Sequence, residues 1–193
     1  MSNYDIAQKI LKKATQKKKD NDIEGALKEL EKAYELCSYD PNDSLPISVH
    51  LRYPKYLLLA GKNDEAWSHL SLLLSKGYSG QDKDFLLMDY ENIYKAMSLF
   101  HKKENNKILH LIYEDMSLLA IIYHDYIHSI ENTFHKDKLK LKLKSNFKKL
   151  NLNINSESYI NLFILFSDKK PKTNLMGGSF IADFNQKANL LLN

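Results

Sequence analysis

The sequence predicts an all-α chain built from stacked antiparallel helix pairs, with a long capping helix and a small C-terminal appendage. Apolar residues recur at spacings of three and four, the helical period, through most of positions 1–150. Glycine and proline number only 6 and 4, which suits long helices and disfavours a turn-rich sandwich or barrel. We therefore expect a helical repeat domain over residues 1–150 and an appendage over residues 151–193.

The first helix pair is predicted between Tyr4 and Leu36. A polar break at positions 17–22 divides its apolar residues into two runs, and Asp and Asn in that break supply turn and N-cap chemistry for the second helix. Two antiparallel helices joined by a tight turn follow from this pattern.

The same pattern returns over positions 46–76. Gly61 suits the left-handed position that ends a helix, and Asn63 or Asp64 can cap the next one. Pro54 lies inside the first of these helices. Because proline removes a backbone donor, that helix should be kinked at Pro54 or should begin later than the apolar pattern suggests.

Aligning Ala26 with Ala66 superimposes the two pairs, and this pattern resembles the tetratricopeptide repeat (TPR). Gly61 and Ala66 match the glycine and the small residue of that family, and Ala14, Ala26 and Ala33 match small positions in the first copy. The resemblance covers about the first 76 residues. The chain departs from the TPR pattern at Pro54, at Ser38, where an inter-repeat proline is usual, and in its period of about forty residues in place of roughly 34.

A third, degenerate pair is predicted from Asp84 to Met116. Two apolar stripes flank a polar turn at positions 103–106, but the small residues of the repeat are gone. Three stacked pairs are about the minimum for a stable solenoid.

From Ser117 to Leu150 the spacing predicts one long helix, or two helices placed end to end, that caps the stack. Between Lys138 and Lys144 lysine and leucine alternate, which would also suit a strand. The appendage at 151–193 holds two short apolar runs around a loop, and either packs on the repeats or becomes ordered with a partner.

The TPR resemblance implies a protein interaction scaffold whose first helices line a concave groove. On that basis Arg52, Lys55 and Tyr56 are candidate partner-binding residues. A guanidinium offers a two-pronged fork for an acidic side chain or a C-terminal carboxylate of a partner. The alternative is a surface arginine paired with a neighbouring acid.

A histidine stripe is the sharpest candidate for metal chemistry. On one continuous helix, His124, His128, Glu131 and His135 would share a face, and histidines four residues apart can chelate zinc or a similar metal. The plainer interpretation is a solvated polar face, and a pH-responsive surface is a third.

The lysine-rich stretch at 136–149 contains seven lysines and one aspartate and is a candidate polyanion-binding face. The plainer interpretation is a solvated face that keeps the cap soluble. The lysines that would contact nucleic acid are Lys138, Lys140, Lys142, Lys144, Lys148 and Lys149.

Composition narrows the setting of the protein. Cys37 is the single cysteine and is expected in the core, and no apolar run is long enough to cross a membrane. The N-terminus lacks a signal-like segment, so a cytoplasmic location is expected. Arg52 stands alone against 27 lysines, which we interpret as the codon bias of an AT-rich bacterial or viral genome.

Common enzymatic motifs are missing from the sequence, including GxGxxG, GxxxxGK, GxSxG, CxxC and HExxH. We therefore expect a non-enzymatic adaptor or regulator without a cofactor, which binds a peptide or helix of another protein. The rival hypotheses are a nucleic-acid-associated regulator and a metal-dependent protein, and the sequence leaves the oligomeric state open.

Overall fold

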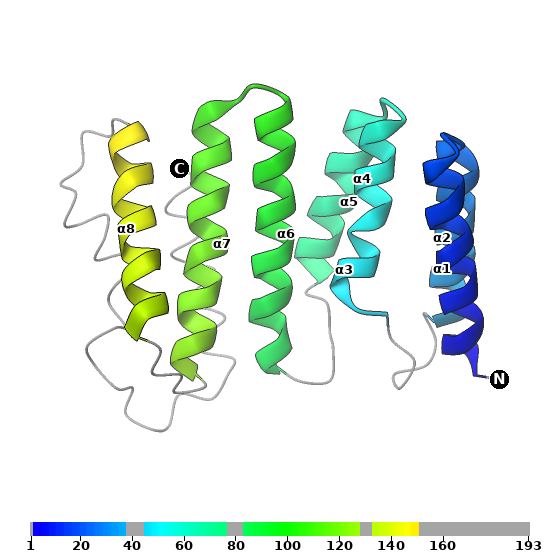
Figure 1. Ribbon diagram of the computed structural model, residues 1–193, viewed down its shortest axis with the longest axis horizontal. Helices are drawn as coiled ribbons and strands as arrows, with labels where there is room; N and C mark the ends of the chain where they lie inside the picture. Colours follow the sequence, from blue (N-terminus) through cyan, green and yellow to red (C-terminus); the bar gives the residue numbers. More distant parts are fainter. Residues whose placement is uncertain (1, 38–44, 77–82, 128–132, 151–193) are drawn as a thin grey trace. The chain divides into compact units, whose positions relative to one another are not determined.

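The computed structural model describes residues 2–37, 45–76, 83–127 and 133–150, and the predicted appendage lies outside these ranges. All regular structure in the described ranges is helical, which confirms the all-α class (Figure 1). The chain divides into two compact units, Met1–Gln81 and Asp82–Asn193, so the division falls inside the range predicted as one domain. None of the helices described has the length and apolar character needed to cross a lipid bilayer.

The first pair of the first unit consists of α1 (Asn3–Lys19) and α2 (Ile23–Cys37), which lie side by side. Ser2 and Asp5 form a capping box at the start of α1, so two of its unpaired N–H groups are satisfied locally. The apolar faces of the two helices meet through small residues and leucines, which lets the backbones approach closely. These fully or almost fully buried residues are Ala7, Leu11, Ala14, Ala26, Leu30 and Ala33.

The second pair of this unit consists of α3 (Ile47–His50), α4 (Arg52–Leu59) and α5 (Asn63–Lys76). The break between α3 and α4 confirms the predicted effect of Pro54. Proline has no N–H to donate to the carbonyl of His50, four residues earlier, and the helix is interrupted at Leu51.

Aromatic side chains join the two pairs of the first unit, where α2 packs against α4. The Tyr34 hydroxyl donates to the Val49 carbonyl at 2.8 Å, and the ring centroids of Tyr34 and Tyr53 are 6.2 Å apart. The Tyr53 hydroxyl in turn donates to Glu31. Burial raises the pKa of Tyr34 well above its ordinary value, so its hydroxyl stays a donor.

The second unit contains α6 (Lys83–Lys103), α7 (Lys107–Ile127) and α8 (Thr133–Leu150). α6 and α7 form the predicted third pair, but the predicted end-to-end cap is wrong. In Figure 1, α8 lies beside α7. Asn146 bonds to Glu114 and Asp115 of α7, and both Asn146 and Leu143 are almost completely buried. Leu141 is 68% exposed, so this lysine-leucine stretch follows the helical period and not the strand alternation.

One turn geometry occurs three times, between α1 and α2, α4 and α5, and α6 and α7. Its central residue is left-handed in each case: Asn21 (φ 62°), Gly61 (φ 77°) and Asn105 (φ 60°). The N–H of this residue bonds to a carbonyl three positions back, and the N–H of the next residue bonds to one five positions back. This is the Schellman motif, which satisfies the last carbonyls of the first helix.

Gly61 should tolerate asparagine better than alanine. A Cβ added there meets no atom within 4 Å, so the cost of substitution is backbone strain alone. We expect Gly61→Ala to lower the free energy of unfolding by about 1 kcal/mol. Gly61→Asn, the residue used in the other two turns, should cost about half as much. Urea unfolding of the three proteins measures the difference, and equal losses would contradict the strain argument.

Candidate functional site

The three identical turns give the helix pairs a common numbering, counted from the left-handed residue. We use the term seam for six positions on the facing sides of each pair. Three lie on the first helix, fourteen, ten and seven residues before the left-handed residue, and three lie on the second helix, five, nine and twelve residues after it. In the first pair the seam is Ala7, Leu11, Ala14, Ala26, Leu30 and Ala33, and in the second it is Ile47, Leu51, Pro54, Ala66, Leu70 and Leu73.

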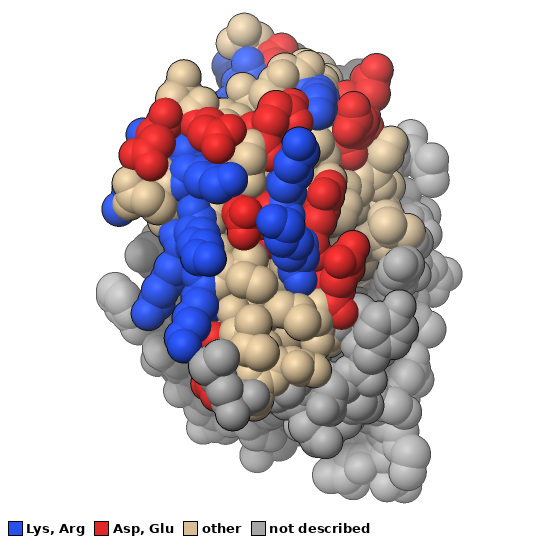
Figure 2. Space-filling model, turned by 90° about the vertical axis from the view of Figure 1, so that its right-hand side faces the viewer, with Lys and Arg blue, Asp and Glu red and all other residues tan. Residues whose placement is uncertain are grey.

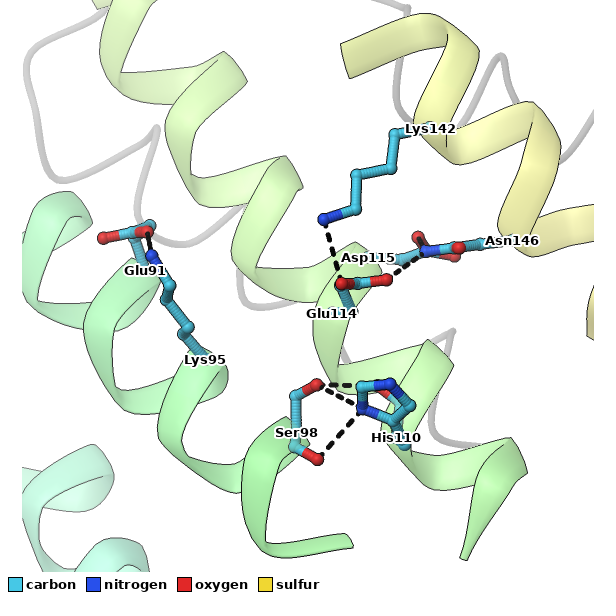
Figure 3. A network of polar contacts seen from close by, with 8 residues as sticks. All are labelled: Glu91, Lys95, Ser98, His110, Glu114, Asp115, Lys142 and Asn146. Carbon is cyan, nitrogen blue, oxygen red and sulfur yellow. Dashed lines mark hydrogen bonds and ion pairs between the residues drawn. The ribbon is translucent and has the colours of Figure 1, made fainter. Parts of the chain in front are cut away.

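The seam of the third pair is polar at all six positions. Its members, which we call the polar seam, are Glu91, Lys95, Ser98, His110, Glu114 and Ser117. These side chains line a groove of about 240 Å³ between α6 and α7, with Lys142 of α8 at its edge (Figure 3). Where the first two pairs bury apolar side chains, the third pair therefore presents a hydrogen-bonding cleft.

Ser98 and His110 clamp the two helices together across the polar seam (Figure 3). His110 Nδ1 lies 3.0 Å from the Ser98 carbonyl oxygen, which can only accept, so we place a proton on Nδ1. The Ser98 hydroxyl donates to the His110 carbonyl at 2.9 Å. The same hydroxyl oxygen lies 2.8 Å from Nδ1, so with the proton placed on Nδ1 it accepts from the imidazole while it donates to the carbonyl. These contacts join α6 to α7.

Glu91 and Lys95 form an ion pair on α6 with 3.6 Å between the amine and the carboxylate oxygen. The Glu91 side chain is only 11% exposed, whereas that of Lys95 is 66% exposed. The carboxylate thus lies at the floor of the groove and the ammonium lies toward solvent.

Glu114 connects α7 to α8. It accepts from Lys142 at 2.9 Å and from the Asn146 amide at 2.8 Å. Burial alone would raise the pKa of Glu114, but these two hydrogen bonds outweigh it and lower the pKa below its ordinary value. Glu114 therefore stabilises the second unit above its unfolded-state pKa, and this stabilisation is lost as pH falls through the lower folded-state value.

The Asn146 side-chain amide also donates to the Asp115 carboxylate at 2.7 Å, and both residues are at most 1% exposed. Asp115 lies ten residues after Asn105, as Glu31 lies ten residues after Asn21. Since Glu31 accepts from Tyr53 of α4, α8 is bonded to α7 at the same position at which α4 is bonded to α2. In this respect α8 resembles the first helix of a further pair.

Aromatic packing also holds α6 and α7 together. Tyr90 and Tyr94 stack along α6, and Tyr94 and His101 contact Tyr113 of α7 with ring centroids 6.1 and 5.2 Å apart. Burial lowers the pKa of His101, so its neutral form is favoured. Because these rings supply packing between the helices, the polar seam is not the pair's only source of cohesion.

The predicted partner-binding residues all lie on α4, but they differ in access. Lys55 is exposed, Arg52 is half-buried and Tyr56 is only 9% exposed. Leu59, which the sequence analysis did not single out, is 49% exposed. On a helix, positions 52, 55 and 59 share one face, so the exposed Lys55 and Leu59 and the half-buried Arg52 form one strip along α4, which we call the exposed strip.

The histidine stripe is not placed on one continuous helix. His124 lies on α7 and His135 on α8, which packs beside α7, while His128 and Glu131 lie outside the described residues. Within the described part of the chain, no group of three or more potential ligands is placed to hold a metal ion. A metal site that includes His128 and Glu131 stays a prediction.

The lysines of α8 separate into two groups. Lys142, Lys144, Lys148 and Lys149 are all exposed, but Lys142 is also paired with Glu114. The side chains of Lys138 and Lys140 lie outside the described residues. Nucleic-acid binding by this helix stays a prediction.

The first helix pair exposes charge of both signs. On the side of the molecule shown in Figure 2, one group of basic side chains lies next to an area where basic and acidic side chains alternate. α1 carries six lysines and one aspartate, and α2 carries four glutamates and two lysines. Because opposite charges lie close together, as in the 3.6 Å pair of Lys17 and Glu29, this face has no single sign to attract a partner.

The polar seam was missed from the sequence, although a signal for it existed. His110 and Glu114 lie five and nine residues after Asn105. At the same distances after Asn21, the first pair has Ala26 and Leu30. No protein-family model, curated protein or solved structure matches the chain. The proposals below therefore rest on the geometry of the chain itself.

Proposed function

We propose that this chain is a protein interaction scaffold of TPR-like helix pairs, a bacterial or viral adaptor or regulator that binds an acidic peptide or helix of a partner. The binding surface is the exposed strip of Arg52, Lys55 and Leu59 on α4. The observation that carries the proposal is this strip, which combines two cations and an exposed leucine on one helix face.

The repeated turn supports the scaffold part of the proposal. Asn21, Gly61 and Asn105 adopt the same left-handed conformation with the same hydrogen bonds, and Ala26 and Ala66 are fully buried five residues after their turns. Helix pairs that recur in this way build an extended surface from side chains on successive first helices.

The chemistry of the strip favours an acidic and partly apolar partner. The Arg52 guanidinium can hold a carboxylate through two parallel hydrogen bonds, and Lys55 adds a second positive charge three residues later. Leu59 offers an apolar contact, and binding energy at such surfaces comes from a few anchors of this kind. Tyr56, the third predicted contact residue, is only 9% exposed and therefore offers a partner little surface.

Charge reversal tests the strip directly. Peptides that bind the wild-type chain are selected from a random displayed library, and their affinities are then measured for the double variant Arg52→Glu with Lys55→Glu. We expect acidic and aliphatic residues in the selected peptides, and at least tenfold weaker binding by the variant, roughly the cost of losing charge-assisted hydrogen bonds.

The double variant Lys18→Glu with Lys28→Glu is the matched control. It makes the same change in net charge at exposed positions of α1 and α2. The control should bind like wild type, and circular dichroism should show equal helicity in all three proteins. Equal weakening by both variants would reduce the effect to net charge and reject the α4 strip.

A second candidate function is contact with nucleic acid through α8, because Lys144, Lys148 and Lys149 are exposed on that helix. Affinity for a polyanion should then fall steeply as salt rises, since neutralised phosphates release counterions. The absence of a mobility shift with single- or double-stranded probes at low salt would remove this candidate.

A further inference from the structure

The polar seam is a departure from the rule that the other two pairs follow. Apolar residues occupy all twelve seam positions of those pairs, whereas the third pair places polar residues there, and all of them except Lys95 are partly or wholly buried. Glu91 is 8%, Ser98 3% and Ser117 5% exposed. Desolvating a carboxylate and two hydroxyls costs free energy that a leucine or an alanine would not, and such costs are concentrated at functional sites.

The charges of the groove are arranged as two exchangeable ion pairs. Glu91 is held by Lys95 and Glu114 by Lys142, and in both pairs the carboxylate is the less exposed partner, at 11% and 26%. Lys102 adds a third ammonium group to the lining. In each pair the carboxylate is thus the inner group and the ammonium the outer one.

An aliphatic wall completes the groove. Leu99 is 47% exposed, Leu118 is buried and Ile121 is half-buried, and all three line the same space as the ion pairs. The volume of about 240 Å³ equals that of roughly eight waters in the liquid. This room is sufficient for a single amino acid.

We propose that this groove binds a small zwitterion of the amino-acid type with an aliphatic side chain. Its ammonium group replaces Lys95 on Glu91, its carboxylate pairs with the released Lys95, and its side chain lies against Leu99 and Leu118. Every charge keeps a partner in this exchange. A ligand without the ammonium group would leave the Glu91 carboxylate, only 11% exposed, without a cation when it draws Lys95 away. A ligand without the carboxylate would forgo the ion pair with Lys95.

The first experiment uses the full chain and three ligands of the same shape. L-leucine carries both charges, isocaproate lacks the ammonium group and isoamylamine lacks the carboxylate. We expect saturable binding of L-leucine by calorimetry or by protein-observed NMR, and binding at least about tenfold weaker for each half-ligand. No saturable binding of any aliphatic amino acid, or equal binding of a half-ligand, would overturn the proposal.

The second experiment restores the apolar seam with residues that the chain itself uses. Glu91→Ala with Lys95→Leu installs the residues found at the same positions of the first pair, Ala7 and Leu11. We expect leucine binding to be lost while the melting temperature stays equal or rises, because apolar replacement of an ion pair is often neutral or stabilising. Retained binding in this variant would contradict the site.

A fold-independent check separates loss of binding from loss of structure. Lys95→Gln alone removes one charge at an exposed position and should weaken leucine relative to isoamylamine. The leucine carboxylate loses its partner, whereas the ammonium group of either ligand loses a competitor for Glu91. An equal effect on both ligands would point to general damage and count against the assignment. The result is independent of the α4 strip, which lies in the other unit of the chain.

Discussion

Replacing Asn146 by aspartate is expected to destabilise the second unit by about 3–5 kcal/mol at neutral pH. The Asn146 amide donates one hydrogen bond to Glu114 and one to Asp115, and the residue is 1% exposed. Aspartate has almost the same shape but no donor. The variant would place three carboxylates together at the buried contact between α7 and α8.

The matched control is Ser145→Asp, the same added charge on the next, exposed residue of α8. It should change the free energy of unfolding by less than about 0.5 kcal/mol. Urea unfolding measures both, and hydrogen exchange should show the loss first in α8. The defect of Asn146→Asp should shrink as pH falls toward 4, because protonation removes the repulsion. A pH-independent defect would mean lost packing and not charge.

The turns could be predicted from the sequence because their chemistry is local. Gly61 and the polar residues at 17–22 and 103–106 specify a left-handed residue followed by a new helix, whatever packs around them. The kink at Pro54 was predictable for the same reason, since a missing N–H acts within one turn.

The position of α8 could not be predicted from the same kind of signal. Leu143 and Asn146 are three residues apart and would face the same way in an end-to-end helix or in one folded back on α7. What decides between the two arrangements is the pair of carboxylates at Glu114 and Asp115, about thirty residues earlier. Such a long-range contact leaves no periodic trace.

Part of the candidate site was predictable and part was not. Arg52 and Lys55 were identified from the repeat resemblance, and Lys55 is indeed exposed, but Tyr56 is buried. The polar seam resembles a solvated helix face when each helix is considered alone. Only the common numbering of the turns shows that Glu91 and Glu114 occupy core positions.

Asp89 supplies the second large effect, and it depends on pH. This residue of α6 is 7% exposed, and within the described part of the chain its Oδ2 atom has no hydrogen-bond partner. Burial raises the pKa of its carboxyl from the ordinary 3.8 to about 7. The folded state thus favours the protonated acid, and stability is lost as pH rises from about 4 to 7, by roughly 2–4 kcal/mol in total.

Asp89→Asn removes this dependence because the amide cannot ionise. The variant should be more stable than wild type by about 1–3 kcal/mol at pH 8. This gain is smaller than the free energy that ionisation of Asp89 costs, because the buried amide also needs hydrogen-bond partners. At pH 5 the gain should be smaller by about 2–3 kcal/mol, because most of the wild-type loss occurs between pH 5 and pH 7, where the folded acid is protonated and the unfolded acid is ionised. Asp64→Asn, the same change at an exposed position of α5, should show no such trend.

Urea unfolding at the two pH values distinguishes the ionisation of Asp89 from its packing. If the gain in unfolding free energy is equal at pH 5 and pH 8, asparagine simply packs better at this position. The folded-state pKa of Asp89 would then lie near that of a solvated acid. A gain confined to high pH means that wild-type α6 carries a buried charge at neutral pH. In that case α6 has two destabilised positions, Asp89 and Glu91, on the helix that lines the proposed ligand groove.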